Sequence, residues 1–154
     1  MSQLAALIAD ETRLLVELED LLRGEQALLK SGRPEGLADL ATTKSTLIEQ
    51  INRLEGERSQ LTGQAELALT PEGMSAWLAA HPAETKAAAA WQQLLARARS
   101  AKEIHLQNGQ LLSLLQKQTD AALDVLLQHQ GRNALYGSDG QAAGRTGSRI
   151  VDSA

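Results

Sequence analysis

The chain has 154 residues, a formal net charge of −4 and no cysteine. The lack of cysteine excludes disulfides and thiolate chemistry, and the acidic balance argues against a dedicated nucleic-acid binder, which would carry a basic face. The sequence holds 28 Leu and 25 Ala but only five Ile, three Val and three aromatic residues, which predicts an all-α fold because strands favour β-branched and aromatic side chains.

The first helix is expected to begin after Ser2, whose hydroxyl can cap it, and to end before Gly32. Its apolar residues repeat every seven positions, which favours left-handed packing against neighbouring helices. The repeat consists of Leu7-Ile8, Leu14-Leu15, Leu21-Leu22 and Leu28-Leu29. Glu11 and Glu25 fall beside this repeat, so they either narrow the apolar seam or lie at its border.

The second helix is expected to begin near Pro34, because proline is favoured in the first turn of a helix. Its apolar face comprises Leu37, Leu40, Leu47, Ile51, Leu54 and Leu61. Lys44 and Arg58 fall on the same face, and since a buried unpaired charge is costly we expect them at an edge or in ion pairs. The short connection after the first helix predicts that these two helices are antiparallel neighbours.

A short third helix is expected to begin at Thr70-Pro71-Glu72 and to end at His81-Pro82. Met74, Trp77 and Leu78 give it one apolar face, which would cover the end of the bundle. We interpret Trp77, and Trp91 in the following helix, as core residues rather than ligand-binding residues.

The last helix is expected to run from Pro82 to Gln130, with Gly109 as its one interior glycine. A helix of this extent would be about 70 Å long and would need partners along its length. Its apolar or small stripe comprises Trp91, Leu94, Leu95, Ala98, Ala101, Ile104, Asn108, Leu111, Leu112, Leu115, Thr119, Ala122 and Leu126. The expected fold is therefore an antiparallel bundle of three long helices, with the short helix between the second and the third.

Five of the 12 glycines lie after Gln130, where few large apolar residues remain. So little apolar surface does not offset the entropy of ordering a chain. We therefore expect a helical bundle domain at residues 1–130 and a mobile, flexible tail at 131–154, or a tail that folds when it binds a partner.

No pattern of residues indicates catalysis. The histidines, His81, His105 and His129, are too widely spaced to form a local metal site, and no phosphate loop or nucleophile motif is present. We therefore expect no enzyme activity, no metal and no cofactor. The start of the chain does not resemble a signal peptide and no apolar run is long enough to span a membrane, so we expect a cytoplasmic protein with no membrane insertion.

Near the end of the last helix, the leucines cover more than one face. Two interpretations are open: both earlier helices bury this surface, or part of it is exposed for a partner.

At these residues the chain resembles the FlgN family of flagellar export chaperones. The resemblance rests on two segments, Asn108-Gly109-Gln110-Leu111-Leu112 in the Leu-rich helix and Leu135-Tyr136-Gly137-x-x-Gly140 in the tail. It implies a cytoplasmic type III export chaperone that holds the C-terminal segments of the hook–filament junction proteins FlgK and FlgL and brings them to the export apparatus. The partner-binding residues that it implies are Asn108, Leu111, Leu112, Leu115, Leu123, Leu126, Leu127, Tyr136, Gly137 and Gly140.

A chaperone of this kind should be a monomer or weak dimer when it is free. The alternative is a structural coiled-coil scaffold or adaptor, which would associate with itself through the leucine seams and form a stable oligomer without any partner.

Overall fold

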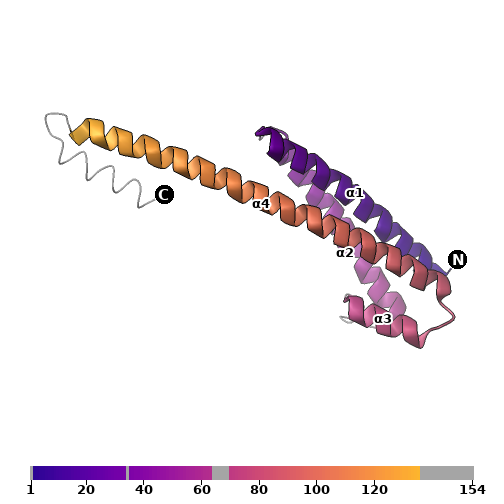
Figure 1. The fold of residues 1–154 in the computed structure, drawn as a ribbon. Helices are drawn as coiled ribbons and strands as arrows, with labels where there is room; N and C mark the ends of the chain where they lie inside the picture. The colour runs from indigo at the N-terminus through magenta and orange to yellow at the C-terminus, as the bar shows by residue number, and fades with distance from the viewer. Residues whose placement is uncertain (1, 34, 64–69, 136–154) are drawn as a thin grey trace. The chain divides into compact units, whose positions relative to one another are not determined.

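The computed structural model describes residues 2–33, 35–63 and 70–135 (Figure 1). These residues form four helices and no strand: α1 (Gln3–Ser31), α2 (Leu37–Thr62), α3 (Pro71–Ala80) and α4 (Thr85–Leu135). The expected all-α bundle with a short helix between the second and third long helices is confirmed. The chain divides into two compact units, Met1–Gly109 and Gln110–Ala154. The boundary predicted after Gln130 stays a prediction, and the predicted tail lies largely outside the described residues.

Both ends of α1 are capped as the sequence predicts. The Ser2 hydroxyl accepts a hydrogen bond from the backbone N–H of Ala5 at 3.0 Å. At the other end Gly32 adopts a left-handed conformation with a φ of 69°. Residues with a Cβ atom rarely adopt this conformation, so glycine suits the position. The N–H groups of Gly32 and Arg33 donate to the carbonyls of Leu29 and Leu28, which is the Schellman arrangement.

Two predicted helix starts are wrong by a few residues. α2 begins at Leu37 rather than near Pro34, because Gly36 has a φ of 92° and cannot belong to a right-handed helix. α4 begins at Thr85 rather than at Pro82. The N–H of Glu84 donates to the carbonyl of His81 at 3.0 Å, so Pro82 lies in a tight turn before the helix, a position that its fixed φ suits.

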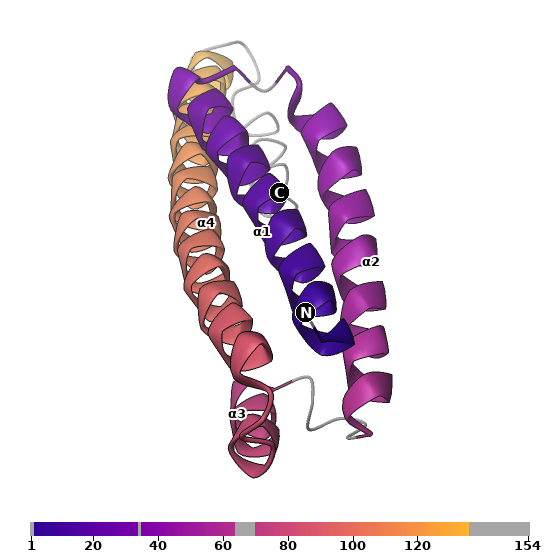
Figure 2. The same ribbon diagram turned by 90° about the vertical axis from the view of Figure 1, so that its right-hand side faces the viewer.

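Within the Met1–Gly109 unit, α1 packs between α2 and the first part of α4 (Figure 2). α2 is antiparallel to α1, as predicted from the short connection. α1 and residues 85–109 of α4 run in the same direction, since the start of α1 contacts the start of α4 and Leu22 lies beside Asn108. The main core cluster consists of Leu4, Ala5, Ile8, Met74, Ala87, Trp91 and Leu94.

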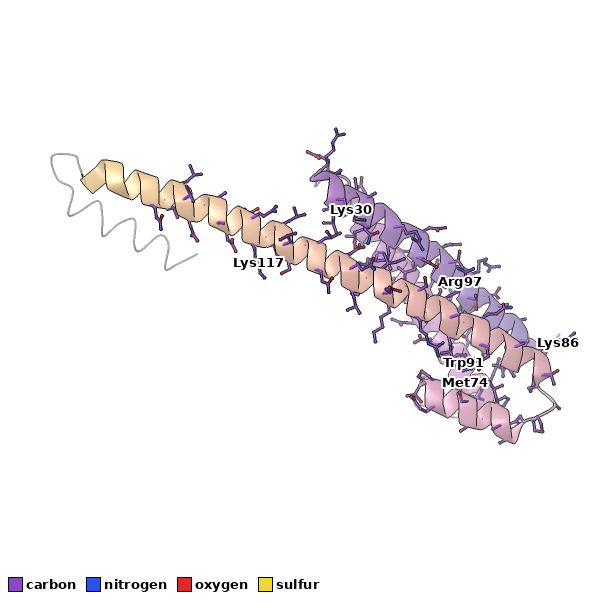
Figure 3. The ribbon with its side chains drawn as sticks, viewed as in Figure 1. Lys30, Met74, Lys86, Trp91, Arg97 and Lys117 are labelled. Atoms are coloured by element: carbon purple, nitrogen blue, oxygen red, sulfur yellow. The ribbon has the colours of Figure 1, made fainter. Side chains whose placement is uncertain are left out.

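α3 contributes to this core, as its apolar face predicts. Met74 is fully buried in the same cluster as Trp91, and Figure 3 labels the two side chains next to each other. Trp77 packs against the cluster and its indole N–H donates to the carbonyl of Thr62 at 3.1 Å. The indole of Trp77 also stacks on the ring of His81, with centroids 3.9 Å apart. These contacts confirm that both tryptophans are core residues.

The two basic residues on the apolar face of α2 are paired, which was one of the two predicted outcomes. Arg58 is buried and forms an ion pair with buried Glu11 of α1. Its guanidinium carbon lies 4.9 Å from the centroid of the Trp91 ring, so the cation also faces an aromatic surface. Lys44 pairs with Glu25 at 3.3 Å. Glu11 and Glu25, the acidic residues beside the leucine repeat of α1, therefore fix the register between α1 and α2.

Candidate partner-binding surface

One stripe of apolar or small residues follows the whole of α4 in steps of three and four residues. In the Met1–Gly109 unit its positions are mostly buried, and most of them pack against α1: Ala87, Trp91, Leu94, Ala98, Ala101, Ile104 and Asn108. The same spacing of three and four residues continues in the next unit. Its positions there are Leu112, Leu115, Thr119, Ala122 and Leu126, which we call the seam. A heptad seam is the part of a helix that normally packs against another helix.

Most residues of the seam and several of their neighbours are exposed, unlike the positions that α1 covers. The exposed fractions are 46% for Leu112, 51% for Leu123 and 63% for Leu126. Leu111, Leu115 and Leu127 are half-buried. Of the two interpretations that the sequence left open, exposure of this surface is therefore the one that the structure supports.

A second apolar stripe lies on another side of the same turns. It consists of Leu114, Gln118, Ala121 and Val125, which we call the second stripe. Leu114 is 52% and Val125 is 64% exposed. Neither residue was among the predicted partner-binding residues. Their separation of 11 residues, close to three helical turns, is the signal that could have identified them.

The charged residues of this segment, with two polar ones, occupy one narrow strip. Ser113, Lys117, Asp120, Asp124 and Gln128 recur three or four residues apart and are all exposed. At 3.6 residues per turn they leave an apolar or uncharged arc of about 220°. The charged side chains of this segment, Lys117, Asp120 and Asp124, all lie in the strip. The arc can therefore be buried without desolvating a charge.

Asn108 has a different environment from the other predicted site residues. It is only 2% exposed, and its amide nitrogen donates to the carbonyl of Leu22 at 2.9 Å and to the Glu25 carboxylate at 3.0 Å. A buried asparagine in a helical seam fixes the register of the two helices. In this conformation Asn108 contacts α1 and has no accessible surface for a partner.

The remaining predicted site residues, Tyr136, Gly137 and Gly140, lie outside the described residues. Among the residues that are described, no group of three or more His, Asp or Glu side chains is arranged to hold a metal ion. None of the described helices combines the length and the apolar character needed to cross a membrane.

The sequence model of the FlgN family, described as "FlgN protein", matches residues 1–144. The chain belongs to the FlgN family. FlgN is a family of chaperones rather than of enzymes. The match covers α1 to α4 and the Tyr136–Gly140 segment, so the sequence resemblance noted above is confirmed.

Two curated members of the FlgN family are similar to this chain over nearly its whole length. Both are named "Flagella synthesis protein FlgN", one from Salmonella typhimurium (strain LT2) and one from Salmonella typhi. Each is 27% identical over 145 residues, which cover 93% of this chain and 92% of the relative. No solved structure matches the chain.

Proposed function

We propose that this protein is a cytoplasmic flagellar export chaperone that binds the C-terminal helical segments of the hook–filament junction proteins FlgK and FlgL. It would prevent their premature association and deliver them to the export apparatus. The observation that supports this proposal best is the uncovered seam of α4, from Leu112 to Leu126, in a chain of the FlgN family. A partner helix that packs there would bury the exposed leucines.

The physical chemistry of the seam suits binding that must later be reversed. Burial of apolar surface contributes about 25 cal/mol per Å² and needs no precise polar geometry. Ordering of the partner segment, and of the chain around Tyr136, Gly137 and Gly140 as it closes over the partner, offsets part of that gain. The result is moderate affinity, which permits release at the export apparatus.

Self-association is the second candidate function, because a heptad seam can also pair with its own copy. A structural scaffold would form a stable dimer or larger oligomer without any partner. Light scattering coupled to size-exclusion chromatography separates the two: the chaperone should have the mass of a monomer at micromolar concentration, or show a weak dimer that dissociates on dilution.

Calorimetric titration with a peptide from the C-terminus of a junction protein tests the chaperone proposal. Leu126→Glu should weaken binding at least tenfold, about 1.4 kcal/mol, because it places a charge in the seam. Ser113→Glu adds the same charge to the polar strip, on the turn that carries Leu112, and should leave the affinity unchanged. Equal affinity for the wild type and for Leu126→Glu would place the site elsewhere.

A truncation after Gln130 tests the contribution of Tyr136, Gly137 and Gly140. Weaker binding by the truncated chain would include the C-terminal segment in the site. Unchanged binding would confine the site to the helices. Binding by neither the full-length nor the truncated chain, together with a stable oligomer, would exclude the chaperone proposal in favour of the scaffold.

A further inference from the structure

The uncharged arc of α4 between Leu111 and Leu127, which carries the exposed leucines and Val125, is wider than one helix can cover. A single packed helix buries a stripe somewhat over 100° wide, whereas this arc extends over about 220°. The seam and the second stripe point in directions about 110° apart at 100° per residue. Both carry leucine or valine side chains that are about half exposed or more.

We propose that the bound partner places two helical segments on α4, one along the seam and one along the second stripe. This inference rests on the proposed function and specifies what the partner must supply. Both segments would come from the same junction protein, as a helical pair whose apolar faces carry no charge opposite α4.

Continuity with an interface already present in the chain supports a helix on the seam. In the Met1–Gly109 unit α4 packs on α1 through residues with the same spacing of three and four, from Ala87 to Asn108. The seam repeats that pattern after Asn108, so a helix bound there would use the packing that α4 already makes with α1.

The composition of the two stripes supports an uncharged helical pair. Gln116 and Gln118 flank the seam where coiled coils often carry charged residues that select partner and orientation. The second stripe, likewise, contains Gln118 and Ala121 between its two large apolar residues. Partner helices with apolar faces and polar, uncharged edges therefore fit both stripes.

Neither the chain's own C-terminal segment nor a second copy provides two such helices. Residues 136–154 contain only Tyr136, Ile150 and Val151 as large apolar residues, which are too few to cover two stripes. In a two-fold dimer both copies use the same surface, so pairing through the seam would leave the second stripe uncovered.

Two probes with the full-length chain test this inference: a peptide of the C-terminal helix of a junction protein, and the whole purified junction protein. Leu114→Glu should weaken binding of the whole protein at least tenfold and change the affinity for the peptide less than twofold. Leu126→Glu should weaken both interactions. Val125→Glu is a second change in the second stripe, closer to the seam, and Ser113→Glu is the control in the polar strip.

The outcomes separate this inference from the proposed function. If Val125→Glu and Leu114→Glu bind the whole junction protein with wild-type affinity while Leu126→Glu weakens both interactions, only one helix docks and the inference is wrong, although the proposed function stands. If the wild type binds neither probe, the proposed function fails and the inference fails with it. A stable trimer or tetramer of the free chain would also overturn the inference, because three or four copies can cover both stripes. Circular dichroism of each variant should show wild-type helicity, since the substituted side chains are exposed.

Discussion

Glu11 and Arg58 place two charges in the interior of the Met1–Gly109 unit. Burial raises the pKa of Glu11 above its ordinary value of 4.5, and the attraction of Arg58 only partly opposes this effect. The ionised pair therefore carries a desolvation cost that a well-packed apolar pair would avoid. Its function in the fold is to select one register between α1 and α2 rather than to maximise stability.

A double-mutant cycle on this pair tests that interpretation. Arg58→Met leaves the Glu11 carboxylate buried without its cation and should lower the free energy of unfolding by about 3–5 kcal/mol. The double variant Glu11→Leu/Arg58→Met removes both charges and should lose much less than the sum of the two single changes. Urea denaturation gives the free energy of unfolding of the wild type, the two single variants and the double variant. If the losses of the two single variants add up to the loss of the double variant, the two side chains are not coupled.

Glu19 gives a prediction for the dependence of stability on pH. Its carboxylate accepts a hydrogen bond from Ser100 at 2.7 Å, the largest cause that lowers its pKa below 4.5, and it also pairs with Arg23 at 3.0 Å. Since the pKa is lower in the folded state, the ionised group stabilises the protein above pH 4.5, and this contribution is lost as the pH falls through the folded-state pKa.

Glu19→Gln should therefore be less stable than the wild type near neutral pH, and the difference should shrink as the solution is acidified. Denaturation curves of both proteins over this pH range provide the measurement. The raised pKa of Glu11 acts in the opposite direction, but it is present in both proteins and cancels in the comparison. A difference that stays constant with pH would mean that the charge of Glu19 contributes nothing.

At the scale of single helices, substitution by alanine should have opposite effects on stability at Gly24, inside α1, and at Gly32, which caps its C-terminal end. Gly24 lies inside the helix and an added Cβ would have no heavy atom within 4 Å, so Gly24→Ala should stabilise the protein by about 0.5–1 kcal/mol. Gly32 has a φ of 69°, so Gly32→Ala should destabilise it by about 1–2 kcal/mol. Thermal unfolding compares the two directly, and shifts of the same sign would contradict this account of the C-cap.

The sequence predicts the end of a helix well where the residue at that end has only one structural role that fits its position. Ser2 and Gly32 each fit a single capping role, and both predictions are confirmed. Pro34 and Gly36 are ambiguous, because proline suits a first turn and glycine suits the residue before it. Only the left-handed conformation of Gly36 shows where α2 begins. Pro82 is ambiguous in the same way, since a turn and a helix start both accept its fixed φ.

For the whole molecule, periodicity identifies the surface of α4 but does not show what covers it. The same heptad register includes Trp91, which is buried, and Leu126, which is exposed. The difference arises because α1 covers only part of this register, and that depends on tertiary packing. The pairing of Glu11 with Arg58 and of Glu25 with Lys44 likewise follows from a helix register that spacing in one chain does not reveal.

Hydrogen exchange should show this division of α4 directly. An isolated helix has marginal stability in water and gains most of its protection from packing, so amides of residues 112–126 should exchange much faster than those of residues 87–108 in the free chain. Addition of a junction-protein peptide should slow exchange in residues 112–126 and leave residues 87–108 unchanged. Equal protection of both segments without a partner would mean that the leucine face is already covered. In that case the mass of the free protein would show whether a second copy covers it.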